Sequence, residues 1–197
     1  MSFKVLSVET KDKKHITVTL TLLVDDKPKK FVISERTYRN IGCPLRSDTV
    51  DPEAMSVIKD EDECRRALSR ALSLLSYADN NQRSLRRKLR MGGFSSHATE
   101  EAIAEVLRLG YVDEEAQVMR KIQQLANRSL LGPARIRAKL RSSGYSGSLV
   151  DGCLCESQRT GEVDFSSVKD KLIEKHSPKT FEERQKLLYK YGFGTND

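Results

Sequence analysis

The sequence predicts a mostly α-helical protein, with tandem three-helix repeats in an elongated array and a small antiparallel β-meander at its N-terminal end. The first reason is a block that recurs after 51 residues: Leu89 and the run Gly93–Ser95 are echoed by Leu140 and the run Gly144–Ser146. Such a period is typical of helical repeat arrays, whose units bury apolar faces against their neighbours. The second reason is that strand-like alternation is confined to residues 3–33, whereas helical spacing follows.

The N-terminal segment, residues 1–42, is expected to form the meander and one short helix. From residue 16 to residue 24, one set of alternating positions is apolar and the other holds three threonines and Leu23, which is the period of a strand with one buried face. Turns at 11–14 and 25–28 separate this strand from its neighbours. Ser34 is well placed to cap the short helix that follows.

The rest of the chain is expected to be helical after a connecting region. Residues 43–61 are predicted to be a linker and a short helix, in which Asp51 is the cap and Pro52 takes the first helical position. Each later helix is amphipathic but too short to be stable alone, so packing must hold it. Three units are predicted: a three-helix repeat at 62–112, a second at 113–163, and a truncated helical repeat at 164–197.

Local signals mark where these helices begin and end. Asp113 and Asp164 each precede a helix and are expected to be N-caps, and Thr180 with Glu183 has the spacing of a capping box. In the third unit the recurring glycine is Gly192, which comes slightly earlier than the period of the first two repeats would place it. Arg184 then takes the position that Leu85 and Ile136 hold in the earlier repeats.

The positive charge is concentrated in the middle of the chain. The net charge is +7, and the stretch from Arg65 to Arg141 holds 16 Lys or Arg against 7 Asp or Glu. A concentrated basic region attracts polyanions or an acidic protein surface. A merely solvated basic surface is the alternative.

The middle helix of each of the first two repeats carries much of this charge. Leu85 and Leu89 share one face of the first helix, Ile136 and Leu140 share one face of the second, and neither helix contains an acid. The candidate partner-binding residues are Arg83, Arg86, Arg87, Lys88, Arg90, Arg135, Arg137, Lys139 and Arg141. Three of these positions recur at the interval of the repeat. We expect a binding function, because like charges on one stripe cost stability; a face balanced by acids of neighbouring helices is the alternative.

Patterns that would indicate catalysis or metal binding are weak. Gly92–Gly93 is better explained as a helix stop than as a phosphate-binding loop. Cys153 and Cys155 fall on a predicted helix, where residues two apart face different ways, and no second cysteine pair accompanies them. The histidines lie in different predicted elements, namely His15, His97 and His176. We therefore expect neither enzyme activity nor a cofactor or metal.

The location expected from the sequence is the cytoplasm. The N-terminus lacks a basic segment followed by an apolar run, and no stretch approaches the roughly 20 apolar residues of a membrane span. The four cysteines show no disulfide framework, which fits a reduced compartment. We expect a monomer that has no membrane partner.

Several runs of residues match a known family. In the first repeat they are Ala71–Tyr77, Leu85–Leu89, Gly93–Ser95, Ala102–Ile103 and Leu109–Glu115. In the second repeat they are Gly132–Leu140 and Gly144–Ser146, and Phe31–Glu35 is similar to the N-terminal extension of longer members. From about residue 62 onward, the chain resembles the RecX regulators of the bacterial RecA recombinase.

This resemblance implies a modulator that binds along the groove of a RecA–DNA filament. It implies inhibition of the filament's ATPase, strand exchange and co-protease activities. From the basic helices we expect only weak binding to single- or double-stranded DNA, without sequence preference. The chain departs from the family pattern at Asn81 and Ser84, where members usually have Ser and Glu. Asparagine still caps a helix, whereas loss of the acid makes this helix more basic.

Two other functions remain open from the sequence. One is an autonomous DNA-binding regulator of the helix-turn-helix type, and the other is a helical scaffold without a nucleic-acid role. A recognition helix would mix Asn, Gln, Ser or Thr with Arg to read bases. The middle helices hold mostly Arg, Lys and Leu, which favours contact with a phosphate backbone or an acidic surface.

Overall fold

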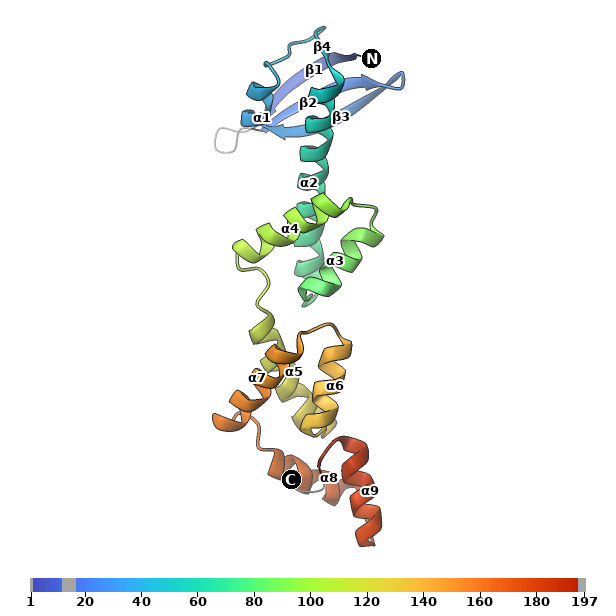
Figure 1. The fold of residues 1–197 in the computed structure, drawn as a ribbon, viewed down its shortest axis with the longest axis vertical. Coiled ribbons are helices and arrows are strands. Elements are labelled where there is room, and N and C mark those ends of the chain that lie inside the picture. Colours follow the sequence, from blue (N-terminus) through green and yellow to red (C-terminus); the bar gives the residue numbers. More distant parts are fainter. Residues whose placement is uncertain (1, 12–16, 195–197) are drawn as a thin grey trace. The chain divides into compact units, whose positions relative to one another are not determined.

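A computed structural model gives the fold of residues 2–11 and 17–194 (Figure 1). His15 and residues 12–14 of the expected turn lie outside this range. Helices predominate and the sheet lies at the N-terminal end, as the sequence predicts. The chain divides into two compact units. The first joins the residues up to Tyr77 to Leu85–Leu109, and the second joins Ala78–Ser84 to the residues from Gly110 onward.

The N-terminal sheet is an antiparallel meander with one added strand. Its strands are β1 (Phe3–Lys11), β2 (Thr17–Val24), β3 (Lys27–Ser34) and β4 (Thr49–Val50), in the order β3-β2-β1-β4. Asp25 and Asp26 both have positive φ, which suits a two-residue hairpin loop. The prediction of a linker after residue 42 was wrong in one respect, because Thr49–Val50 forms a strand that pairs with β1. A strand of two residues is too short to show an alternating pattern in the sequence.

Two helices pack on this sheet. The short helix α1 (Glu35–Asn40) is capped by the Ser34 hydroxyl, as expected. The long helix α2 (Pro52–Tyr77) buries Met55 and Ile58 in the same apolar cluster as Leu20 and Leu22 of β2. Its N-terminal cap is the Asp51 carboxylate, which accepts a hydrogen bond of 2.7 Å from the Ala54 amide.

The helix break expected at residue 62 does not exist, because α2 runs unbroken from Pro52 to Tyr77. Asp62 is buried in its middle instead of beginning a helix. One carboxylate oxygen accepts a hydrogen bond of 2.9 Å from the Val32 amide of β3, and the other binds Arg66 at 2.8 Å. The acid therefore ties the helix to an edge strand, a role that local sequence does not reveal.

The remaining helices follow α2 in chain order. They are α3 (Gln82–Met91), α4 (Ser96–Arg108), α5 (Glu114–Ser129), α6 (Pro133–Ser142), α7 (Gly147–Arg159), α8 (Phe165–His176) and α9 (Phe181–Tyr191). The expected caps are confirmed: Asp113 and Asp164 accept amide hydrogen bonds, and Thr180 forms a capping box with Glu183. Asn81 likewise accepts from the Ser84 amide at 2.8 Å.

The middle helices α3, α6 and α9 end in the same way. Gly93, Gly144 and Gly192 have φ values of 86°, 100° and 87°, the left-handed conformation that glycine adopts at a helix end. The amide of the aromatic residue after each glycine donates to the carbonyl of the leucine five residues earlier, at 3.3, 3.2 and 3.0 Å. The shared ending fixes the register of the third repeat, in which Gly192 corresponds to Gly144.

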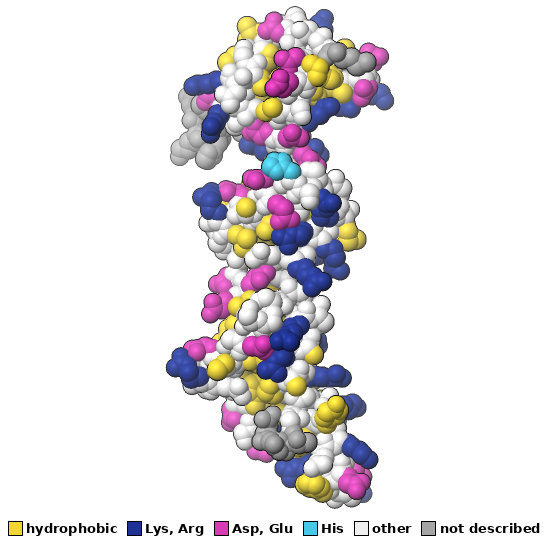
Figure 2. Space-filling model, viewed as in Figure 1, with side chains coloured by type: hydrophobic (Ala, Val, Ile, Leu, Met, Phe, Trp, Pro, Cys, Tyr) yellow, Lys and Arg dark blue, Asp and Glu magenta, His cyan; other side chains and the backbone are white. Residues whose placement is uncertain are grey.

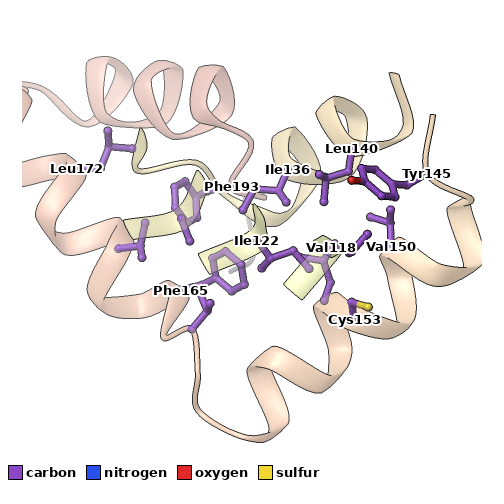
Figure 3. Packing of buried hydrophobic residues seen from close by; sticks show 14 residues of the cluster. Val118, Ile122, Ile136, Leu140, Tyr145, Val150, Cys153, Phe165, Leu172 and Phe193 are labelled. Carbon is purple, nitrogen blue, oxygen red and sulfur yellow. The ribbon is translucent and has the colours of Figure 1, made fainter. Parts of the chain in front are cut away.

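The second unit has its own apolar core, in which helices from both repeats meet (Figure 3). Ile122 of α5, Ile136 and Leu140 of α6, and Leu172 of α8 are almost fully buried. Phe193 closes the cluster beyond the end of α9. The recurring apolar positions of α6 are therefore structural.

A buried polar network lies beside this core. The Tyr145 hydroxyl donates to the Gln117 side-chain carbonyl at 2.9 Å, and the Gln117 amide group donates to the Asn80 backbone carbonyl at 3.3 Å. Burial raises the pKa of Tyr145 to about 12, so this hydroxyl keeps its proton at neutral pH. The network ties the residues that precede α3 to the start of α5 within the second unit.

Tyr145→Phe is expected to lower the free energy of unfolding by about 1–2 kcal/mol, because Gln117 then loses its buried donor. The pKa of Tyr145 is raised from 10.0 to about 12 in the folded state, so the wild-type protein loses stability as pH rises across this window. The variant lacks that contribution. Urea unfolding at pH 7 and above pH 10 measures both effects; equal stability of the two proteins throughout would contradict the network's role.

Candidate functional site

None of the basic residues of α3 and α6 belongs to the buried apolar rows of these helices. Leu85, Leu89 and Ile136 have no exposed surface and Leu140 is 2% exposed, so the expected buried rows are confirmed. Figure 2 shows Lys and Arg side chains gathered over α3 in the first unit and over α6 in the second. The helix ends and caps described above hold each of these faces in place.

Some of the predicted binding residues are engaged by acids of the third helix in each repeat. Arg86 of α3 makes two hydrogen bonds to the Glu100 carboxylate of α4, at 2.6 and 2.8 Å. Arg137 and Arg141 of α6 share the Asp151 carboxylate of α7, at 2.5 and 2.7 Å. Arg86 and Arg137 are separated by the interval of the repeat, and so are Glu100 and Asp151. The ion pair between middle and third helix is therefore itself part of the repeat.

These contacts lower the pKa values of the two carboxyl groups. Hydrogen bonds from Arg86 lower the pKa of Glu100 below its ordinary value, with a smaller contribution from the charge of Arg90. Hydrogen bonding from Arg137 and the charge of Arg141 do the same for Asp151. Both acids are ionised at neutral pH, so the alternative of a face balanced by neighbouring acids holds for Arg86, Arg137 and Arg141.

The other predicted residues divide into exposed cations and one partly buried side chain. The side chains of Arg83, Arg87, Arg90, Arg135 and Lys139 are exposed, and within residues 2–11 and 17–194 none of them makes an ion pair. Lys88 is partly buried. The five exposed cations are the part of the predicted site that is available to a partner, and we call them the exposed basic set.

Arg83 has a second role within the second unit. Its side chain lies against Gly144 at the end of α6, where a Cβ atom would stand 2.9 Å from the Arg83 Cδ. The neighbouring Asn81 side chain donates to the Ser143 carbonyl at 2.9 Å. The start of α3 thus meets the end of α6, and Arg83 is partly a packing residue.

Glu100 and Asp151 are the site residues that sequence reasoning missed. The sequence left a face balanced by neighbouring acids open as an alternative without indicating which acids, and the partners come from the helix that follows each basic helix. These acids recur at the same interval as the arginines that they bind, and this shared period is the signal that would have found them.

The exposed groups of this surface are of the kind that bind anions. Guanidinium groups bind phosphate and carboxylate in a planar, bidentate way, and exposed lysine adds a point charge. In the part of the chain that the structure describes, no group of three or more His, Cys, Asp or Glu could hold a metal ion. No described helix is both long and apolar enough to cross a membrane.

Comparison with known proteins finds relatives of this chain. No family model matches the chain. Regulatory protein RecX of Salmonella paratyphi B is 30% identical over 143 residues, which cover 64% of this chain and 83% of the relative. Regulatory protein RecX of Lactobacillus johnsonii is 24% identical over 167 residues, covering 76% of this chain and 61% of the relative. Regulatory protein RecX of Leuconostoc citreum is 24% identical over 129 residues, covering 66% of this chain and 48% of the relative. The chain therefore spans only about half to three-fifths of the length of these two longer relatives.

Solved structures share the fold. A crystal structure of regulatory protein RecX is similar with a TM-score of 0.73 at 23% identity, over 100% of this chain and 96% of the other. A crystal structure of RecX from Lactobacillus salivarius is similar with a TM-score of 0.58 at 21% identity, over 68% of this chain and 91% of the other. At these identities the likeness shows the fold alone.

Proposed function

The chain belongs to the RecX family of regulatory proteins, and from this premise we propose that it binds a RecA–DNA filament and inhibits the filament's ATPase, strand exchange and co-protease activities. The observation that carries the proposal is the exposed basic set on α3 and α6. These cations are exposed and lie outside the buried apolar rows, on helices that contain no acid.

Electrostatics support a polyanionic partner. Cations that contact phosphates release condensed counterions, so such binding weakens steeply with salt and carries little sequence information. Arg86, Arg137 and Arg141 are already engaged by acids of the third helix in their own repeat, so the exposed basic set is the part of the predicted site that we assign to the partner. DNA phosphates and acidic surfaces of the filament protein are both suitable targets.

An autonomous, base-reading regulator is the second candidate because of one feature of α5. Its outer face presents Arg120, Gln123, Gln124, Asn127 and Arg128 around a shallow hollow, and these side chains are of the kind that reads base edges. However, Arg120 binds Asp79 and Gln123 binds Glu162. Those contacts reduce what the face can offer to a DNA groove, so we place this function second.

The test is RecA ATPase on single-stranded DNA, with the protein titrated onto a preassembled filament. We expect the rate to fall to a plateau, and the concentration needed to rise steeply with salt. A rate unchanged at saturation would contradict the proposal. Sequence-selective, nanomolar duplex binding at physiological salt would favour the second candidate.

A further inference from the structure

The third repeat changes the chemistry of the recurring basic positions. With the register fixed by Gly144 and Gly192, the positions of Arg137, Lys139 and Arg141 in α6 correspond to Gln185, Leu187 and Tyr189 in α9. Conversely, the position of the buried Ile136 holds Arg184. None of the residues of α9 is buried. The third middle helix therefore replaces a basic stripe by a mixed aromatic and basic face.

Two large aromatic side chains stand out on this face. Tyr189 is 81% exposed and Phe181 is 74% exposed, two of the most exposed large apolar residues in the described chain. They are eight residues apart on one helix, so they lie on the same side of it with Arg184 and Gln185 between them. Burial in a core cannot account for either aromatic ring.

Hollows flank Tyr189 on two sides, both within the second unit. One, of about 200 Å³, lies between α8 and α9 and is lined by Lys169, Phe181 and Arg184. The other, of about 440 Å³, lies between α6 and α9 and is lined by Arg135 and Ala138. Tyr189 and Phe193 line both hollows. A planar group resting on Tyr189 would thus have a recess on either side.

The charge of these hollows is positive. Three cations line them, namely Arg135, Lys169 and Arg184, and no described carboxylate does. The nearby acid Glu183 is turned to the helix start, where its carboxylate accepts from the Lys179 and Thr180 amides at 2.9 and 3.4 Å. The face therefore combines exposed aromatic rings with cations that have no compensating acid in the hollows.

We propose that this face of α9, with Arg135 and Lys169, binds single-stranded DNA by stacking bases on Tyr189 and Phe181 while the cations hold the phosphates. Interleaved aromatic and basic side chains are the general means by which single strands are bound without sequence preference. In a duplex the base faces are stacked on one another, so they are not accessible to the rings of Tyr189 and Phe181. The choice of DNA over RNA rests on the proposed function; the stacking chemistry does not.

Stacking can be seen directly because the chain contains no tryptophan. Tyr189→Trp introduces a single indole, and we expect an oligo(dT) strand to quench its fluorescence. An abasic strand of equal length and charge should quench it much less. Tyr111→Trp is the matched control, since Tyr111 is also exposed, at 58%, and lies outside both hollows. Equal quenching by the two strands, or equal quenching in the control, would overturn the proposal.

Affinity gives an independent readout that needs no recombinase. Tyr189→Ala is expected to weaken oligo(dT) binding by roughly tenfold and Tyr111→Ala to leave it unchanged, with helicity checked by circular dichroism. Unchanged affinity in Tyr189→Ala would refute base stacking, and tighter binding of an RNA strand would refute the choice of DNA. Failure of filament inhibition, in contrast, would remove the proposed function and leave these results standing.

Discussion

Changing Arg87, Arg90, Arg135 and Lys139 together to glutamate is expected to abolish inhibition of the RecA filament while the helical content stays the same. All four side chains are exposed, and in the described residues none of them makes an ion pair. Each cation that meets a phosphate of single-stranded DNA contributes about 0.7 to the slope of log affinity against log salt. We therefore expect the salt slope to fall by about three, and affinity at physiological salt to drop about a hundredfold. ATPase titration and circular dichroism measure the two effects.

The matched control removes charged pairs without changing the net charge. Arg86→Gln is combined with Glu100→Gln, and Arg137→Gln with Asp151→Asn, because these side chains already engage each other. Ion pairs on the surface contribute little to stability, so this variant should fold and should still inhibit. If inhibition survives the fourfold reversal, or is lost equally in the control, the exposed basic set is not the contact surface.

Reversal of Arg86, Arg137 and Arg141 would not separate binding from folding. A glutamate at position 86 would face Glu100, and glutamates at positions 137 and 141 would surround Asp151. Such variants place like charges between the middle and third helices. Any lost activity could then come from a displaced helix and not from a missing contact.

The parts of the fold that depend on local chemistry could be predicted from the sequence. Gly93, Gly144 and Gly192 end helices because the left-handed conformation costs glycine little, and Asp113 and Asp164 begin helices because their carboxylates accept amide hydrogens. Leu85 and Ile136 are buried because helical spacing places them on the apolar face. Each of these outcomes is decided within a few residues of the chain.

The parts that depend on distant partners could not be predicted in this way. Asp62 has the same residue type as Asp113, but it sits inside a helix and binds the Val32 amide 30 residues away. Gly110 ends a helix just before Asp113, whereas no glycine stands between Pro52 and Asp62. The same limit hid the ion pairs of the candidate site, because the acid in each case comes from another helix.

Gly192 lies at a close backbone contact between two repeats within the second unit. Its carbonyl accepts from the Ala134 amide at 3.1 Å, and the adjacent Tyr191 carbonyl accepts from the Gly132 amide at 2.8 Å. The end of α9 thus satisfies amides at the start of α6, where no side chain supplies a cap. A Cβ atom on Gly192 would meet the backbone nitrogen of Arg135 and would stand 2.5 Å from its Cβ, so the two helix ends would have to separate.

Gly192→Ala is therefore expected to lower the free energy of unfolding by about 3 kcal/mol or more, from the left-handed backbone and the steric clash together. Gly161→Ala is the matched control, since Gly161 also has a positive φ, of 73°, but its Cβ would meet nothing within 4 Å. It should cost only about 1 kcal/mol. Urea unfolding of both variants measures the difference, and equal losses would mean that backbone strain alone acts at Gly192.

Gly132→Ala approaches the same contact from the other side, since its Cβ would stand 2.5 Å from the Gly192 carbonyl oxygen. Gly132 has a negative φ, so alanine there causes no left-handed backbone strain. If the close approach of the two helix ends is what matters, Gly132→Ala is nevertheless destabilised like Gly192→Ala.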